Sequence, residues 1–584
     1  MNRVAWVVVS LLFCVPLFVG LGLTDMQNDE AIYSFGADVM AASGNWLSPK
    51  SSPWETEPFL EKPPLKIWIV AAPIRLGLLP DNEFGLRFWD ALFGSAAFLY
   101  VFAIGRRIGG SICGVLSVLM LFVQRSLVFE HGLRSNNMEA TLVLAYCAGI
   151  YHFIAWTSSS SDTRSRFHVF AVALYFVLAF MTKFVAALFL PVIIAAVLLA
   201  RRVDRMRLAR SWRLWLAAAA LAVVIVSPWF AYQHVRYGAV LWEALFGSAV
   251  YARFTGYLDP AHVQPWHYYL SRMWSEAATA RTLLWTLGGL VLLCWRSVRT
   301  NRADELTILL WFALPVGLIS LGTSKLYHYA YPFLPPLALA AGYVASLAVG
   351  AVTSGLEWLS GWVGRSIPRA ARTAFDSRVG RRLALAIGVT SCLVALPALA
   401  MGSFKLALWG DVVLRVSTPF RVLPVLVLAV LVSRRARPLA VVAAVLILAP
   451  VLPVDAYQRN VSSLSVERHP LRSLGECLQR VAEGHADASG RSPIYAEDGR
   501  ASHPAAFYLR RLGRWSFETA SDANVYTSLF GQPRPVLLSA SRFRTLDVGD
   551  RLKNIPAVPV LDQVMLLPGP FGACAIDNGR SLWR

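Results

Sequence analysis

The stretch VAWVVVSLLFCVPLFVGLGL, residues 4–23, is apolar over its whole length and is followed directly by TDMQNDEAIYSFG, residues 24–36. A helix of roughly 20 apolar residues is long enough to cross the hydrocarbon core of a bilayer. No A-x-A cleavage pattern follows the run, so we interpret it as an uncleaved membrane helix and not as a secretory signal. This helix predicts a membrane fold and would deliver the acidic residues that follow it to the membrane surface.

The composition of the whole chain agrees with a polytopic membrane protein. Its 584 residues are 56% hydrophobic and only 15% charged, which excludes a single soluble globule. Windows of roughly 20 apolar residues recur along the chain, and we expect about thirteen membrane helices. The expected spans lie near residues 4–23, 83–105, 111–128, 138–156, 167–182, 184–200, 212–234, 281–295, 305–322, 328–350, 382–402, 415–432 and 438–455.

Basic residues alternate between the loops and indicate the orientation of the chain, because Lys and Arg gather in cytoplasmic loops. With a cytoplasmic N-terminus, every loop expected inside is basic. These loops contain Arg106 and Arg107, Arg164 and Arg166, RRVDRMRLARSWR, WRSVRTNR, the Arg-rich segment 365–382 and SRRARP. They account for most of the net charge of +20, so nucleic-acid binding is excluded as its cause.

This topology exports three segments: residues 24–82, residues 235–280 and the tail from 456 to 584. We therefore expect a transmembrane domain over 1–455, which includes the first two segments as outer loops, and a separate soluble tail over 456–584. Short apolar runs alternate with helix-like stretches in the tail, which predicts an α/β domain. Cys477 and Cys574 both lie in the tail, and either a disulfide or two unpaired thiols is consistent with the sequence.

The first outer loop is the richest in polar residues. EAIYSFGADVMAAS and KIWIVAAPIRLGLL have apolar residues at helical spacing and are expected to lie along the membrane interface. FLEKPPL stands between them, and its two prolines restrict the residue before them. Glu61 and Lys62 are therefore expected in an extended, preset geometry.

Four motifs of the chain, in their order, resemble a known family. NDEAIYSFGADVMAASGNWLSP followed by FLEKPPLKIW, then HGLRSNNMEATLVLA, ARFTGYLDPAHVQPWHYYL and SKLYHYAYPFLPPLALA, are similar to segments of the GT-C integral-membrane glycosyltransferases. The similarity is to the branch that contains protein O-mannosyltransferases and lipid A aminoarabinose transferases, and it covers residues 25 to about 340. The second acidic position is Glu139 where the family pattern has Asp. Beyond residue 380 only the architecture, about thirteen helices and an exported tail, is similar.

The resemblance implies a GT-C fold, a bacterial inner-membrane location and a sugar donor carried on a polyprenyl phosphate. Such a transferase needs cations for the phosphate and a carboxylate that takes a proton from the acceptor. Asp29 is the expected base, with Glu139 as the second acidic residue of the site. Lys62, Lys325 and Tyr329 are expected to hold the donor phosphate, His328 is a weaker third member of that group, and Arg134, Glu139 and His262 would shape the site.

Several of these residues also have a purely structural interpretation. Asp25 and Glu30 are expected to be mostly solvated, and Arg134 and Glu139 could pair only with each other at the start of a helix. Lys62 and Lys325 could extend to the lipid headgroups. Glu61 and His262 could hold a divalent metal, but two ligands far apart in sequence do not satisfy the usual spacing of a metal site.

Taken together, the sequence predicts an inverting glycosyltransferase that moves one sugar from a polyprenyl-phosphate donor to lipid A, another glycolipid or a protein at the outer face. Two other classes remain open. A lipid-linked substrate transporter or flippase would show repeated halves and interrupted helices, and we find neither in the sequence. A different lipid-processing membrane enzyme, such as one similar to O-antigen ligases, would share the topology.

Overall fold

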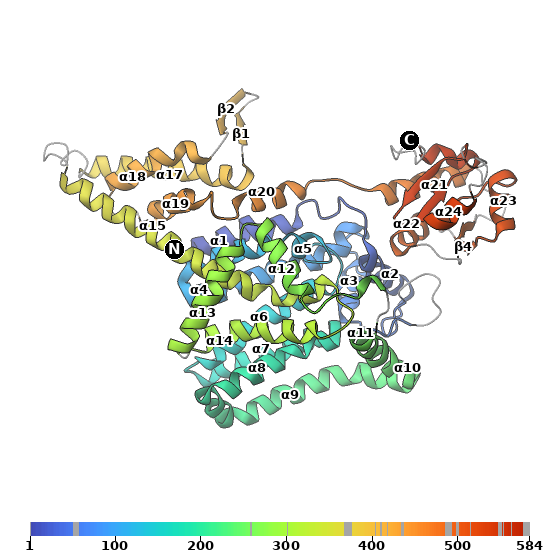
Figure 1. The fold of residues 1–584 in the computed structure, drawn as a ribbon, viewed down its shortest axis with the longest axis horizontal. Helices are drawn as coiled ribbons and strands as arrows, with labels where there is room; N and C mark the ends of the chain where they lie inside the picture. Colours follow the sequence, from blue (N-terminus) through green and yellow to red (C-terminus); the bar gives the residue numbers. More distant parts are fainter. Residues whose placement is uncertain are drawn as a thin grey trace. The chain divides into compact units, whose positions relative to one another are not determined.

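Helices dominate the computed structural model of the chain (Figure 1). The structure describes residues 2–50, 58–256, 260–300, 302–366, 377–402, 404–408, 411–416, 419–433, 437–484, 493–497, 502–513, 516–546, 552, 554–561 and 563–575. The chain forms two compact units. Unit 1 comprises residues 1–19, 90–134 and 138–465, and unit 2 comprises residues 20–89, 135–137 and 466–584.

Within the described residues, seven helices are long and apolar enough to cross a membrane, so the chain is a multi-pass membrane protein. They lie at Glu83–Phe122, Glu139–Thr157, Asp162–Ala187, Arg202–Tyr237, Ala303–Ser320, Pro335–Val363 and Arg382–Leu399. Four shorter apolar helices lie at Arg3–Phe18, Phe189–Ala200, Phe420–Leu431 and Arg437–Leu448. The expected number of thirteen spans is not confirmed.

Two breaks explain part of the difference in number. Helix α4, Glu83–Phe122, covers two of the expected spans and is interrupted at Gly110, whose φ of 85° and ψ of −179° are outside the helical region. A glycine adopts this positive φ without the steric cost that a side chain would add. Helices α12, Tyr268–Thr279, and α13, Leu283–Thr300, form a pair bent by 120° that counts as at most one span.

Unit 1 is a helical bundle in which α6, α7, α8 and α9 lie side by side (Figure 1). Its helices before residue 263 are α1 (Asn2–Val9), η1 (Ser10–Cys14), η2 (Val15–Phe18), α4 from Asp90 onward, α5 (Arg125–Phe129), α6 (Glu139–Thr157), α7 (Asp162–Ala187), α8 (Phe189–Ala200), α9 (Arg202–Tyr237), α10 (Ala239–Trp242), η3 (Glu243–Tyr251), α11 (Ala252–Thr255) and η4 (Pro260–His262). After α12 and α13 follow α14 (Ala303–Ser320), η5 (Tyr327–Phe333), α15 (Pro335–Ser366), α17 (Arg378–Met401), η6 (Pro419–Val422), α18 (Leu423–Ser433), α19 (Arg437–Leu448) and α20 (Val454–Ser463).

One expected helix boundary in unit 1 is wrong. The span expected from residue 415 begins later, because β1, Phe404–Leu408, and β2, Asp411–Val416, form an antiparallel hairpin there. The sequence DVVLRV is rich in β-branched residues, which suit a strand. Residues 367–376 and 434–436, which belong to two of the expected basic loops, lie outside the described part of the chain.

Unit 2 contains both amphipathic segments of the first outer loop. They form helices α2, Asn28–Ser43, and α3, Leu65–Arg75. Gly44, with a φ of 72°, ends α2 in the left-handed conformation that glycine favours at this position. The prediction of two helices separated by FLEKPPL is confirmed.

The tail, the part of unit 2 from residue 466 onward, has the expected α/β fold. Its elements are α21 (Pro470–Gly484), β3 (Pro493–Ala496), α22 (His503–Gly513), β4 (Ser516–Thr519), α23 (Asp522–Phe530), β5 (Val536–Ser539), α24 (Ala540–Leu546), β6 (Ala557–Val560), β7 (Gln563–Leu566) and η8 (Gly569–Ala575). The sheet has the strand order β4-β3-β5-β7-β6, with β4, β3 and β5 parallel and the last two pairings antiparallel. Helices α22 and α23 provide the crossovers that parallel strands require.

The tail also contains a disulfide between Cys477 of α21 and Cys574 of η8. The sequence left this pairing open, and the structure decides in its favour. The bond joins residues 97 apart in the chain. In the chain-entropy model, a cross-link of this length stabilises the folded state by about 4–5 kcal/mol.

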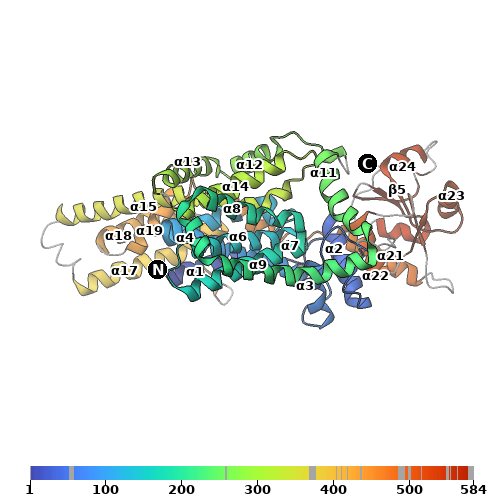
Figure 2. The same cartoon turned by 90° about the horizontal axis from the view of Figure 1, so that it is seen from below.

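The hydrophobic core of unit 2 joins the first outer loop to the tail. Its buried residues from the loop include Met26, Ala37, Met40 and Ile67, and those from the tail include Leu474, Leu478, Ala505, Tyr508 and Leu537. Both views show α2 beside α22 (Figures 1 and 2). This compact unit therefore includes residues that the sequence assigned to the transmembrane domain, while the proposed domain boundary at 455/456 stays a prediction.

Candidate functional site

The predicted base, Asp29, lies in the first turn of α2. The helix begins with a capping box in which Gln27 and Glu30 satisfy each other's backbone N–H groups. Asp29 is half-buried, and the described residues include no hydrogen-bond or ion-pair partner for its carboxylate. A carboxylate near a helix N-terminus is stabilised by the helix dipole. Asp29 is therefore held in place by its backbone while its side chain is available.

The neighbouring Glu30 is fully buried and committed to structure. Arg87 Nε donates to Glu30 Oε1 at 2.6 Å, and Arg87 Nη2 donates to Oε2 at 2.9 Å. The backbone N–H of Asn136 also donates to Oε1, at 2.8 Å. Burial raises the pKa of Glu30, but these donors outweigh burial and hold the pKa below its ordinary value. The expectation that Glu30 is mostly solvated is wrong.

Asp25 is also engaged and not a solvated companion. Its carboxylate accepts from the backbone N–H groups of Leu471, at 2.6 Å, and Arg472, at 3.3 Å. Burial raises the pKa of Asp25, partly offset by these two donors and by His469. The sequence placed three carboxylates within six residues, and the structure separates them: two are fixed in the scaffold of unit 2, and Asp29 alone of the three has no such partner among the described residues.

Lys62, in unit 2, lies against two aromatic rings. Its ammonium contacts the hydroxyl of Tyr33 and lies 4.8 Å from the centroid of the Tyr33 ring and 5.4 Å from that of Phe59. Such cation–π contacts hold an ammonium without neutralising its charge. Lys62 and its neighbour Glu61 are half-buried in the loop that leads into α3. These contacts fix the position of the Lys62 ammonium within unit 2.

A second lysine of unit 2, Lys66, was missed by the sequence analysis. Lys66 is fully buried, and its ammonium donates to Asn136 Oδ1 at 2.7 Å. The side-chain amide of Asn136 donates in turn to Ser34 Oγ at 3.0 Å. Through its backbone bond to Glu30, Asn136 joins α2, α3 and the motif HGLRSNNMEATLVLA into one polar network. A signal was present, since a lysine in an apolar helix is costly to bury without a partner.

Unit 1 contains a separate polar group around Glu139, at the start of α6. Glu139 is buried, and its Oε1 lies 2.9 Å from Lys183 Nζ and 4.0 Å from His328 Nε2. Lys183 Nζ also lies 4.7 Å from the centroid of the Tyr329 ring. His328 stacks on His131, with ring centroids 4.9 Å apart. The structure therefore brings together three of the predicted site residues: Glu139, His328 and Tyr329.

Lys183 was also missed, although it is the centre of this group. The expected spans near residues 167–182 and 184–200 leave Lys183 in a short connection between them. In the structure, α7 continues through it with a kink, at a φ of −152° and a ψ of 80°. An ionisable residue inside an apolar helix is a functional candidate by default, and this rule would have identified Lys183.

Arg134 contacts the end of the first apolar helix, Arg3–Phe18. Its Nη1 donates to the carbonyl oxygens of Pro16, at 3.0 Å, and Leu17, at 2.8 Å. The last carbonyls of a helix lack partners within the helix, and a basic side chain can satisfy them. Arg134 therefore shapes unit 1 through the backbone of its first helix.

Lys325 and His262 lie together in unit 1, but the Lys325 ammonium is occupied. The backbone N–H of Lys325 donates to the carbonyl of His262 at 2.8 Å, and its Nζ donates to the carbonyl of Gln264 at 2.8 Å and contacts that of Gly322. Burial lowers the pKa of Lys325. The segment is not α-helical, since the 3₁₀ helix η5 begins at Tyr327, so Lys325 and Tyr329 do not lie on one face of an α-helix.

The described residues do not fit a metal site. They contain no group of three or more His, Cys, Asp or Glu side chains arranged to hold an ion. The expected ligands, Glu61 and His262, are not part of such a group, and their role stays a prediction. A divalent metal therefore has no defined set of ligands in the described part of the chain.

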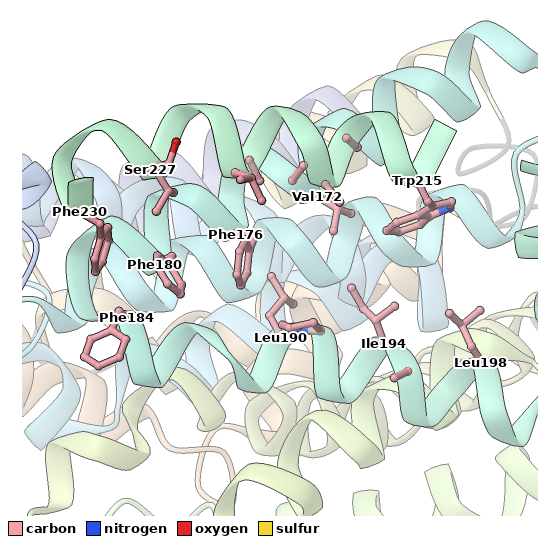
Figure 3. Close-up of a pocket in the computed structure, with 18 of the residues that line it drawn as sticks. Val172, Phe176, Phe180, Phe184, Leu190, Ile194, Leu198, Trp215, Ser227 and Phe230 are labelled. Atoms are coloured by element: carbon pink, nitrogen blue, oxygen red, sulfur yellow. The ribbon is translucent and has the colours of Figure 1, made fainter. Parts of the chain in front are cut away.

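Unit 1 also has an apolar groove of about 690 Å³ between α7, α8 and α9 (Figure 3). Figure 3 shows Phe176, Phe180 and Phe184 in a row along α7, with Leu190 on α8 and Phe230 on α9 around them. Phe184 follows Lys183 directly in the chain, so the groove begins one residue beyond the polar group around Glu139. The arrangement suits an amphiphile, with a hydrocarbon chain in the groove and a polar head near Lys183.

Comparison with known proteins gives one family match. The model of the dolichyl-phosphate-mannose-protein mannosyltransferase family matches residues 61–232. This segment includes Lys62, Arg134, Glu139 and Lys183, and ends before the second outer loop.

Curated relatives point in the same direction. The chain is 27% identical over 345 residues to undecaprenyl phosphate-alpha-4-amino-4-deoxy-L-arabinose arabinosyl transferase 1 of Pseudomonas fluorescens strain Pf0-1, covering 58% of this chain and 57% of the relative. It is also 27% identical over 327 residues to the corresponding transferase of Pseudomonas aeruginosa strain LESB58, covering 54% of each. The chain therefore matches little more than half the length of these relatives.

Solved structures show the same fold over almost the whole chain. The crystal structure of ArnT from Cupriavidus metallidurans bound to undecaprenyl phosphate has a TM-score of 0.60 and 19% identity, covering 96% of this chain and 97% of that chain. The archaeal oligosaccharyltransferase AglB from Archaeoglobus fulgidus has a TM-score of 0.52 and 12% identity, covering 99% of this chain and 77% of that one.

Fold and comparisons together define the class as a multi-pass membrane protein with the GT-C fold and an α/β tail. Within that class, they confirm the resemblance to glycosyltransferases of the lipid A aminoarabinose transferase type.

Proposed function

We propose that the protein is a glycosyltransferase that moves one sugar from a polyprenyl-phosphate donor to an acceptor at the outer face of a bacterial inner membrane. The observation that carries this proposal is the carboxylate of Asp29, which the scaffold of unit 2 holds at the start of α2 but leaves without a partner among the described residues. The similarity to transferases named for undecaprenyl-phosphate aminoarabinose supports the class of donor and favours a lipid A-type acceptor.

In this reaction an acceptor hydroxyl or amine attacks the anomeric carbon of the sugar. The bond between that carbon and the phosphate oxygen breaks, and the phosphate leaves with the electron pair while Asp29 takes the proton of the nucleophile. A single direct attack inverts the anomeric configuration. Lys62 has the charge needed to stabilise the phosphate as negative charge develops on it.

The polar group of unit 1 would serve the donor in another way. We assign Lys183 and His328 to the donor headgroup, Glu139 and Tyr329 to the orientation of Lys183, and the groove along α7 to the prenyl chain. Because the Lys325 ammonium already binds carbonyl oxygens, its proposed role is to hold the segment around His262. Arg134 would keep the end of the first helix in place.

Localisation and orientation are part of the proposal. The N-terminus and the basic loops would be cytoplasmic, and FLEKPPL and the tail would be exported. The disulfide in the tail supports export, because such bonds persist in oxidising compartments.

The test compares Asp29→Asn with the wild-type protein in isolated membranes supplied with a radiolabelled polyprenyl-phosphate sugar. The substitution preserves shape but removes the base, so transfer should fall by roughly 10²–10⁴ while donor binding survives. Asp162→Asn, at the exposed start of α7, is the matched control and should leave the rate unchanged. Full activity of Asp29→Asn would reject the catalytic role, and flipping of the donor without transfer would favour the transporter class.

A further inference from the structure

The strand-like segment that leads into α2 is paired with the tail through its backbone. The N–H of Asp25 donates to the carbonyl of Arg468 at 3.0 Å, and the N–H of Arg468 donates to the carbonyl of Leu23 at 2.8 Å. These bonds form a parallel bridge between Thr24 and Arg468. Two segments more than 440 residues apart in the chain are therefore in register at this point, within unit 2.

Asp25 also supplies the cap of α21. The first N–H groups of a helix have no partner within the helix, and an aspartate close to them is a favoured acceptor. The Asp25 carboxylate fills this role for Leu471 and Arg472 at the start of α21, and its Oδ1 lies 3.4 Å from His469 Nδ1. Capping residues usually precede their helix directly, whereas this one comes from the first outer loop.

Tyr508 of α22 fixes the next residue. The N–H of Met26 donates to the Tyr508 hydroxyl at 2.9 Å, and that hydroxyl donates to Glu83 Oε1 at 3.1 Å. Arg472 Nη1 lies 3.2 Å from the other oxygen of Glu83. Met26 and Tyr508 are both almost completely buried, so water does not compete for these bonds.

Asp29 therefore lies between two residues that are held by hydrogen bonds. Met26, three residues before it, is held by Tyr508, and Glu30, the residue after it, is held by Arg87 and Asn136. Catalysis is sensitive to placement, since a misplacement of about 1 Å can reduce the rate by about 10². The contacts with the tail are therefore of the kind that determines where the Asp29 carboxylate points.

We infer that the tail is a positioning element for the proposed base: α21 and α22 hold residues 24–26 and thereby orient Asp29, so Asp25 and Tyr508 are positioning residues for transfer. The inference rests on the proposed function, because it takes Asp29 as the base. It gives the exported tail a role in the chemistry without placing any of its residues on the substrate.

The first variant to measure is Tyr508→Phe in the full-length protein, assayed with the radiolabelled donor. The ring and its packing remain, but Met26 N–H and Glu83 lose their shared hydroxyl. We expect kcat to fall by roughly 10–100-fold with the KM for the donor unchanged within about twofold, because only orientation is disturbed. Tyr526→Phe is the matched control, since Tyr526 is an exposed tyrosine of α23 that stacks on Phe530, and it should keep wild-type kcat.

The second pair, Asp25→Asn and Asp25→Ala, tests the capping contact. Asparagine keeps one side-chain oxygen and should recover most of the kcat that alanine loses, a graded rescue that general loss of folded protein would not produce. Activities are normalised to the amount of folded protein, measured as the fraction that binds donor.

The outcomes distinguish a failure of the positioning role from a failure of the proposed function. If Tyr508→Phe and Asp25→Ala keep wild-type kcat while Asp29→Asn is inactive, the positioning role is wrong and the proposed function stands. If Asp29→Asn is also fully active, the proposed function itself fails. A rise in the donor KM at unchanged kcat in Tyr508→Phe overturns the inference as well, because the tail would then contribute to binding and not to orientation.

Discussion

The three carboxylates of the first outer loop show how little sequence proximity says about role. Asp25, Asp29 and Glu30 lie within six residues, yet two of them are tied to partners from distant parts of unit 2. All three are carboxylates in one short polar stretch. Only the presence or absence of hydrogen-bond and ion-pair partners among the described residues distinguishes them. The sequence predicts a role for Asp29 from its position in a motif that resembles the family, and the structure adds that its carboxylate has no partner among the described residues.

The proposed role of Lys62 can be tested by substitution. Lys62→Ala should reduce transfer by roughly 10²–10³, or ~2–4 kcal/mol of transition-state stabilisation, because it removes one preset cation from the leaving phosphate. Folding should change much less than activity, by about 1 kcal/mol, since the contacts with Tyr33 and Phe59 that are lost include a hydrogen bond and cation–π contacts of a half-buried side chain. Rates with radiolabelled donor and thermal unfolding are measured on the same preparation.

The control for this variant is Lys50→Ala, which removes a half-buried lysine from the same unit. It should leave transfer unchanged. Equal losses in the two variants would indicate a general effect of positive charge and would contradict a specific contact between Lys62 and the phosphate.

The helices and strands that the sequence predicts correctly are those whose apolar residues follow one clear periodicity. The amphipathic patterns of α2 and α3 and the αβ alternation of the tail were sufficient to place these elements. The hairpin β1–β2 was missed because apolar, β-branched residues next to a span extend its hydropathy window. The kink at Lys183 was missed because two apolar runs that meet at one charged residue predict a loop as readily as a bent helix.

The buried ion pair of Glu30 and Arg87 connects α2 to the start of α4. The pKa of Glu30 is lower in the folded protein than its ordinary value of 4.5, so the pair stabilises the fold above about pH 4.5. That contribution is lost as the pH falls below this value and Glu30 takes up a proton. Thermal unfolding followed from pH 7 to pH 3.5 should therefore show a loss of stability confined to the acid end.

Glu30→Gln is the comparison that isolates this pair. It should be less stable at pH 7 by about 3–5 kcal/mol, because Arg87 is left buried without its counter-ion, and its acid limb should be flatter than that of the wild-type protein. The raised pKa of Asp25 acts in the opposite direction, and the lowered pKa of Glu497, caused by its hydrogen bonds with Ser539, acts in the same direction. Both groups are present in the two proteins, so parallel acid limbs would contradict the assignment to Glu30.

At the scale of the whole molecule, the orientation of the chain is the property that the sequence predicts most directly. The alternation of basic loops places residues 201–213 in the cytoplasm and the tail outside. Single reporter cysteines at Ala209→Cys and Ser541→Cys, both at exposed positions, test it after the exposed Cys294 has been replaced by serine. An impermeant thiol reagent applied to intact cells should label only the second, and the reverse pattern would overturn the topology.

The grouping of the first outer loop with the tail could not have been predicted from this sequence. The segments are separated by most of the membrane helices, and their pairing depends on hydrogen bonds such as those of Asp25 and Tyr508, which leave no periodic pattern. A single sequence indicates whether each segment favours a helix or a strand. It does not indicate which distant segment each one contacts. The sequence therefore predicted the parts of unit 2 and not their association.

The bridge between Thr24 and Arg468 also fixes an order of events in the cell. At about 5–20 residues per second, a ribosome needs roughly 20–90 s to proceed from the first of these residues to the second. Throughout that time Thr24 has been made, while the segment that pairs with it has not. A nascent chain is therefore expected to insert most of its helices before unit 2 can be completed.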